Sequence, residues 1–229
     1  METLTIQGIP AILYGAPSEK LFLFIHGRNG CKEEAAAFAE IACPKGYQVL
    51  GFDLPEHGER KSETDTFFPW NAVSEFKNIL SFAKGRWSQI SVRANSIGAY
   101  FSMLSFAEES IHKCLFVSPI FNMEKLIGNM MIWSGVTEER LEKEGVIPTD
   151  FGETLSWEYL NYVRNHRIAD WQIPTSILYG TADNLQERQT VDAFIAQFSC
   201  KLTVMKGGEH WFHTPEQLEV LARWETEIL

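Results

Sequence analysis

Three residues of this chain are of the types that together carry out nucleophilic attack on a carbonyl group. Ser96 lies in the stretch ANSIG, Asp183 in GTADNL and His210 in GGEHWF. A serine hydroxyl needs a base to accept its proton, and that base needs a carboxylate to orient it. The three side chains therefore predict a nucleophile, an orienting acid and a base, provided that the fold brings them together.

Ser96 falls between a strand-like stretch, ISVR, and a helix-like one, IGAYFSMLSF. A nucleophile on such a tight turn needs small residues two positions away on either side, because the strand and helix backbones pass close together. Ala94 and Gly98 meet this need, although alanine tolerates a strained φ less well than glycine. Serine is also a common N-cap residue, so the pentapeptide by itself leaves both interpretations open.

Asp183 and His210 each follow a glycine turn that ends a strand-like run, ILYG and LTVM respectively. Taken alone, Asp183 could be a turn carboxylate or a helix cap, and His210 a loop or core histidine. Taken together, three strand ends on one sheet edge favour a joint site. His213 competes with His210 for the role of base.

The buried run LFLFI ends in HGRNG, and this turn could supply donors for an oxyanion. We expect the backbone N–H of Arg28 to be one donor and that of Ile97 the other, with Asn29 a weaker candidate for the first. The Arg28 side chain could be a surface charge or could hold an acidic substrate. His26 is expected to be structural, whereas His57 could line a pocket.

The elements that must position these residues alternate along the chain. The expected strands are Thr3–Gln7, Ala11–Tyr14, Lys20–Ile25, Tyr47–Phe52, Gln89–Arg93, Lys113–Val117, Thr175–Tyr179 and Lys201–Met205. The expected helices are Glu33–Ala42, Trp70–Trp87, Ile97–Glu108, Gln186–Gln197 and Pro215–Ile228. A starting hairpin followed by strand–helix units predicts an α/β fold, with a mostly parallel central sheet and helices on both faces.

The segment from about 121 to 168 interrupts this alternation and shows no clear buried strand. We expect short helices that form a small cap over the carboxyl edge of the sheet, where ligands bind in open α/β sheets. A peripheral helical bundle is the alternative. The Met and aromatic residues of this segment could line an apolar acyl pocket or could simply belong to the core. They are Met123, Met130, Met131, Trp133, Trp157, Tyr159 and Tyr162.

Length and charge narrow the classes of partner. The 229 residues suit a single domain, 1–229, and the net charge of −10 disfavours nucleic acid and anionic lipid, so neither nucleic acid nor a membrane is an expected partner. No secretory signal is visible, which predicts a cytoplasmic protein. Cys31, Cys43, Cys114 and Cys200 form no C-x-x-C pair and are expected to be structural thiols.

The sequence resembles the α/β-hydrolase superfamily over nearly its whole length. The motifs that carry this resemblance are IHGRNG, GFDLPEHGER, RANSIGAYF, IPTSILYGTADNL and GGEHWFHTPEQ, with Glu56 and Ala94 where the family often has glycine. The resemblance implies Ser96 as nucleophile, His210 as general base and acid, and Asp183 as orienting acid, in the order typical of the family. It also implies neither a metal nor an organic cofactor.

We therefore expect a serine hydrolase that cleaves a small carboxylic ester, thioester or lactone through an acyl-enzyme on Ser96. The alternatives are a non-catalytic binding protein with the same fold, and an acyltransferase or peptidase that uses the same triad. The candidate substrate-binding residues are Asn29, Asn95, His57 and Trp133. The sequence leaves the oligomeric state open, with a homodimer among the alternatives.

Overall fold

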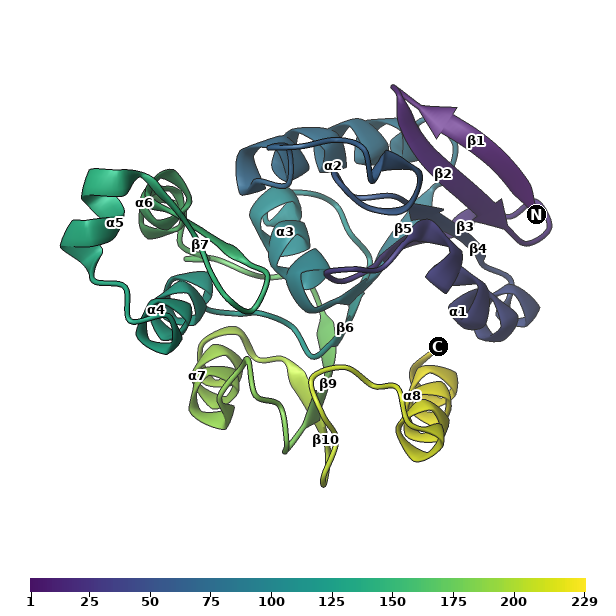
Figure 1. Cartoon of the computed structure of the whole chain (residues 1–229). Helices are drawn as coiled ribbons and strands as arrows, with labels where there is room; N and C mark the ends of the chain where they lie inside the picture. The colour runs from purple at the N-terminus through teal and green to yellow at the C-terminus, as the bar shows by residue number, and fades with distance from the viewer.

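The computed structural model describes residues 1–229, which form a central eight-stranded sheet (Figure 1). Its strands are β1 (Glu2–Ile6), β2 (Ile9–Tyr14), β3 (Lys20–Ile25), β4 (Gln48–Phe52), β5 (Gln89–Asn95), β6 (Cys114–Val117), β9 (Thr175–Gly180) and β10 (Lys201–Met205). They lie in the order β1-β2-β4-β3-β5-β6-β9-β10. Only β1–β2 and β2–β4 pair antiparallel, so the predicted mostly parallel sheet is confirmed.

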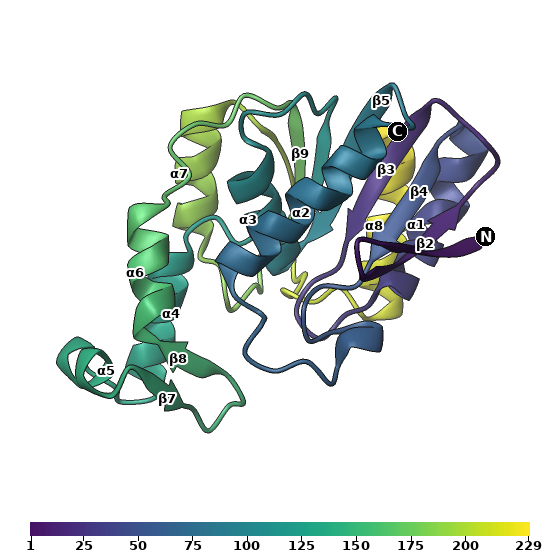
Figure 2. The same ribbon diagram turned by 90° about the horizontal axis from the view of Figure 1, so that it is seen from above.

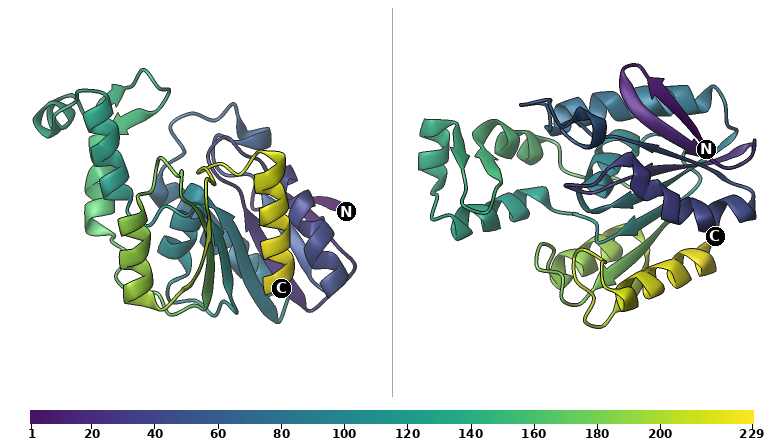
Figure 3. Two further views of the ribbon diagram at one scale, coloured as in Figure 1. Left: turned by 90° about the horizontal axis from the view of Figure 1, so that it is seen from below. Right: turned by 45° about the vertical axis from the view of Figure 1, so that its right-hand side comes forward.

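Helices cover both faces of this sheet, as the alternating pattern predicted. The helices of the chain are α1 (Ala35–Ala42), α2 (Pro69–Lys84), α3 (Ser96–Phe106), α4 (Met123–Trp133), α5 (Glu138–Glu144), α6 (Trp157–Asn165), α7 (Arg188–Phe198) and α8 (Pro215–Ile228). Figure 3 shows α7 and α8 on opposite sides of the sheet. None of these helices combines the length and apolarity needed to span a bilayer.

The two faces follow from the alternation of side chains along each strand. In β3, Leu21 and Leu23 pack in the core under α2, α3 and α7, whereas Phe22 and Phe24 pack in the core under α1 and α8. Both sets are buried, which is why LFLFI reads as a continuous apolar run rather than an alternating one. All eight predicted strands are present, with ends within a few residues of those expected.

The segment that breaks the alternation contains α4, α5 and α6, and also a short antiparallel hairpin that the sequence did not reveal. Its strands are β7 (Val146–Pro148) and β8 (Thr154–Ser156). Each has only three residues, too few for a period of two to become visible. Figure 2 shows α5, β7 and β8 projecting away from the sheet, with α4 and α6 connecting them to it.

Candidate active site

Ser96 occupies a strained turn between β5 and α3. Its φ is 48°, a left-handed value that non-glycine residues adopt rarely and that concentrates at functional positions. Ala94 does not share this strain, because it is a regular strand residue paired with Ile25 of β3. The missing family glycine therefore matters only for space, and the fully buried alanine side chain satisfies that demand.

Gly98 allows α3 to pack directly against the end of β3. A Cβ at this position would lie 2.5 Å from the carbonyl oxygen of His26 and 2.8 Å from Cγ2 of Ile25. Real side chains do not tolerate such contacts, so glycine is required here by close approach. The helix that begins at Ser96 is thereby held beside the turn that follows β3.

We expect Gly98→Ala to lower the free energy of unfolding by about 2 kcal/mol, because an added methyl group in a packed interior forces backbone shifts. Gly128→Ala is the matched control: it lies inside α4, and a Cβ there meets nothing within 4 Å. Alanine favours helix over glycine, so the control should raise stability by up to about 1 kcal/mol. Urea unfolding measures both, and equal effects would contradict the packing argument.

The structure brings Ser96, His210 and Asp183 into one chain of hydrogen bonds. Ser96 Oγ lies 2.7 Å from His210 Nε2, and His210 Nδ1 lies 2.8 Å from Asp183 Oδ2. With the Nδ1 proton donated to the carboxylate, Nε2 is left to accept the serine proton. Asp183 is fully buried at its carboxylate, and its other oxygen accepts N–H bonds from Leu185 and Gln186, both at 2.9 Å.

His213 does not compete for this position. Its ring is exposed, stacks on Trp211 and has Nδ1 2.8 Å from the Trp211 carbonyl oxygen. His210 is therefore the histidine that reaches Ser96.

The loops that carry Asp183 and His210 are joined by backbone hydrogen bonds. Ala182 N–H donates to the Gly208 carbonyl at 2.8 Å, and Thr181 N–H donates to the Met205 carbonyl at 3.0 Å. A side chain on Gly180 would overlap the backbone of Gly208. The glycine turns that the sequence showed after both strands thus permit the close approach that sets the acid beside the base.

The turn after β3 lies directly against the serine. A Cβ on Gly27 would sit 3.4 Å from Ser96 Cβ, and the N–H of the next residue, Arg28, has no acceptor within the protein. Ile97 is the second residue of α3, where backbone N–H groups have no intrahelical acceptor. The two N–H groups chosen from the sequence are thus free of protein acceptors beside the serine.

His26 holds this turn in place. Its Nδ1 lies 2.8 Å from the Gly27 carbonyl oxygen, and its Nε2 accepts from the Leu54 N–H at 3.1 Å. Burial lowers the pKa of His26 to about 4, so the ring is neutral at neutral pH and keeps one donor and one acceptor. Its role is structural, as expected from the sequence.

The Arg28 side chain connects the turn to the inserted segment. Its Nε donates to Glu153 Oε1 at 3.1 Å, and its guanidinium lies 4.8 Å from the centre of the Phe67 ring. Glu153 immediately precedes β8. The side chain is about one-third exposed, and its charge is already paired with that of Glu153.

A cavity of about 290 Å³ lies beside Ser96, between the sheet edge and the inserted segment. Most of its walls are apolar: Phe67, Phe68, Ile97, Ile120, Met123, Leu126, Ile127, Met130, Val146, Leu155, Tyr159 and Leu185. Of the Met and aromatic candidates, Met123, Met130 and Tyr159 line it, whereas Met131, Trp133, Trp157 and Tyr162 do not. Leu126 and Ile127 were missed; their helical spacing with Met130 was the signal available for them.

Asn95 requires a correction, because it does not face this cavity. Its side-chain oxygen accepts from Arg93 Nη1, and Arg93 Nε donates to Glu225 of α8 at 2.6 Å. Alternation along β5 places Arg93 and Asn95 on the α8 side of the sheet. The Arg93 guanidinium is almost fully buried. The Asn95 side chain therefore hydrogen-bonds Arg93 on the far side of the sheet from the cavity and is not available to a ligand.

Three other candidate substrate-binding residues also lie away from the cavity. Asn29 is exposed at a turn, with a left-handed φ of 63°. His57 is buried with Nδ1 2.7 Å from the Pro55 carbonyl oxygen, and it packs against Phe67. Trp133, at the end of α4, is half-exposed and packs against Phe151. No group of three or more His, Cys, Asp and Glu side chains is arranged to hold a metal ion.

Comparison with known proteins gives one partial sequence match and many structural ones. No family model matches the chain. A curated protein, hydrolase pyiE from Pyricularia grisea, is 26% identical over 139 residues, or 51% of this chain and 30% of that protein. The match therefore spans less than a third of the curated relative.

Solved structures match almost the full chain. Est1E from Butyrivibrio proteoclasticus, with ferulic acid bound, gives a TM-score of 0.77 at 21% identity, covering 100% of this chain and 97% of Est1E. Alpha/beta hydrolase domain-containing protein 10 from mouse gives 0.77 at 13% identity, covering 99% and 97%. A thioesterase domain from the curacin biosynthetic pathway gives 0.63 at 15% identity, covering 98% of each chain.

Proposed function

Because the chain has the α/β-hydrolase fold, we propose that it is a serine hydrolase that cleaves a small carboxylic ester, or a thioester or lactone, through an acyl-enzyme on Ser96. The observation that carries this proposal is the hydrogen-bonded chain from Ser96 Oγ through His210 to Asp183, at the wall of an apolar cavity. Such a chain is the arrangement that converts a serine hydroxyl into a nucleophile.

The reaction begins when Ser96 Oγ attacks the substrate carbonyl carbon and its proton passes to His210 Nε2. Asp183 accepts a hydrogen bond from Nδ1 and stabilises the positive ring that results. The negative oxygen of the tetrahedral intermediate is held by the N–H groups of Arg28 and Ile97. Collapse of the intermediate breaks the bond to the leaving group, which takes the proton from His210.

The second half of the reaction repeats these steps with water. Nε2 accepts a proton from water, the resulting hydroxide attacks the acyl carbon, and the Ser96 oxygen leaves with the proton that His210 returns. The apolar walls of the cavity, which include Leu126 and Met130, favour an apolar acyl group over a charged acyl group. The bound ferulic acid of Est1E and the thioesterase activity named for the curacin domain support a carboxylic acyl substrate.

A fluorophosphonate probe tests this proposal directly, because it reacts with an activated serine. We expect labelling of the native protein, with the adduct mapped to Ser96 by peptide mass spectrometry. The protein fraction that the probe labels should also hydrolyse p-nitrophenyl esters, thioesters or lactones. The relative rates then identify the preferred class of substrate. A folded protein that neither labels nor hydrolyses any of these would instead be a binding protein with this fold.

A further inference from the structure

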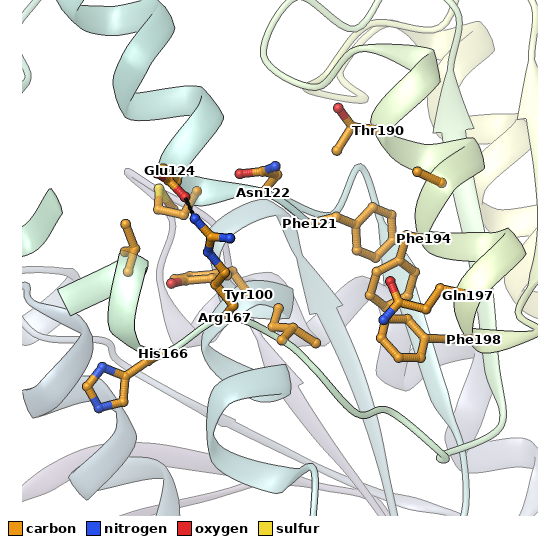
Figure 4. A pocket seen from close by; sticks show the side chains of 14 residues that line it. Tyr100, Phe121, Asn122, Glu124, His166, Arg167, Thr190, Phe194, Gln197 and Phe198 are labelled. Atoms are coloured by element: carbon orange, nitrogen blue, oxygen red, sulfur yellow. Dashed lines mark hydrogen bonds and ion pairs between the residues drawn. The ribbon is translucent and has the colours of Figure 1, made fainter. Parts of the chain in front are cut away.

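A second cavity, of about 400 Å³, lies between the inserted segment and α7 (Figure 4). Phe121, Phe194 and Phe198 form one aromatic wall, with ring centres 3.9 Å and 4.7 Å apart for successive pairs. Figure 4 places Tyr100 and Arg167 across from this wall. Nothing in the catalytic steps described above uses these residues.

The second cavity continues the one beside Ser96 along the same elements. From α3, Ile97 lines the first cavity and Tyr100 the second. From α6, Tyr159 lines the first and Val163 the second. Helical residues three and four positions apart lie on the same face, so each helix presents one continuous surface to both cavities. The two spaces are therefore neighbours on one seam between the core and the inserted segment.

Met123 belongs to the walls of both cavities and is the one residue that they share. It is the first residue of α4, and 6% of its surface is exposed. Methionine is unbranched and changes rotamer readily, so it can move aside where a branched side chain could not. Met123 is thus the wall residue common to the two cavities, and its side chain is of a type that can change rotamer readily.

The lining of the second cavity indicates what could occupy it. The three phenylalanine rings offer apolar contact, whereas the rest of the lining includes polar and charged side chains: Asn122, Glu124, His166, Arg167, Thr190 and Gln197. Arg167 is paired with Glu124 at 2.9 Å, so the site has no unpaired cation to hold an anion. An apolar chain would therefore lie against the wall formed by Phe121, Phe194 and Phe198.

We propose that the second cavity is a distal subsite of the same active site, which receives the far end of a long acyl chain that passes Met123. The inference rests on the proposed hydrolase function and adds a substrate class, esters of long, mainly apolar carboxylic acids. A short acyl group would remain in the first cavity and make no contact beyond Met123.

Ala193→Trp tests this inference by filling the second cavity without touching the first. Ala193 lines only the second cavity and is exposed on α7, so the larger side chain should be tolerated. We expect kcat/KM for p-nitrophenyl laurate to fall about tenfold or more, the scale of lost apolar contact in a binding pocket. Hydrolysis of p-nitrophenyl butyrate should change by less than about twofold, as for surface substitutions.

Ala196→Trp is the matched control, because it makes the same change on an exposed part of the same helix that lines neither cavity. It should leave both esters unaffected. Met123→Ala should raise the laurate-to-butyrate ratio of kcat/KM, and adding Ala193→Trp should abolish that gain.

The outcomes separate the inference from the function on which it rests. Equal effects of Ala193→Trp on the two esters, or none on either, would overturn the distal subsite and leave the hydrolase intact. So would a wild-type protein that hydrolyses the butyrate ester and not the laurate ester. A wild-type protein that hydrolyses neither ester and resists the fluorophosphonate would overturn the proposed function, and the subsite with it.

Discussion

Ser96→Ala is expected to lower kcat by about a million-fold, the loss seen when the nucleophile of a serine triad is removed. No other hydroxyl lies within hydrogen-bonding distance of His210 Nε2, so nothing can replace the serine oxygen. The variant should also fail to react with a fluorophosphonate. Steady-state hydrolysis of the preferred ester and probe labelling measure these effects.

Ser105→Ala controls for the loss of a hydroxyl from the same helix. Its Oγ donates to the Phe101 carbonyl at 2.7 Å and has no part in the site, so kcat should be unchanged. Retention of full ester hydrolysis by Ser96→Ala would show that another group is the nucleophile.

Asp183→Asn is expected to lower kcat by about ten thousand-fold while the protein remains folded. The physical reason lies in the two sides of the carboxylate. Oδ1 accepts N–H bonds from Leu185 and Gln186, so the amide oxygen of asparagine must take that side. The NH₂ group then faces His210 Nδ1, which must become an acceptor. The ring proton moves to Nε2, and the base can no longer accept a proton from Ser96.

Kinetics and circular dichroism on the same samples measure this effect. Asp192→Asn is a suitable control, since Asp192 is exposed on α7 and pairs only with Arg188 at 2.7 Å. KM should change little in Asp183→Asn, because the carboxylate does not line the cavity. A kcat within tenfold of the wild type would show that Asp183 does not set the tautomer of His210.

Much of the fold could be predicted because its signals are local. The run LFLFI is apolar throughout because both faces of β3 are covered, and length and apolarity suffice to recognise such a strand. The hairpin of β7 and β8 could not be recognised, because each of its strands has only three residues, too few for an alternating pattern to be visible. Local sequence patterns therefore predicted the strands of the central sheet and missed the two three-residue strands of the hairpin.

The catalytic residues of the candidate site also have local sequence signals, whereas the cavity walls do not. Ser96, Asp183 and His210 each follow an apolar run and a tight turn, and parallel strands place such ends on one edge. The cavity walls carry no such mark. Residues such as Phe67 and Leu155 become neighbours only when distant segments pack, and the Arg28–Glu153 pair joins residues 125 positions apart.

By itself, the sequence determined the residue types, their order and their place at strand ends, since each depends on neighbours within one strand and turn. Only the tertiary structure decided that Asn95 turns toward Arg93 and α8, that Trp133 lies outside the cavity, and that Met123 lines two cavities. These outcomes depend on which surfaces meet across the fold. Contacts of that kind are set by packing between distant segments and leave no periodic pattern along the chain.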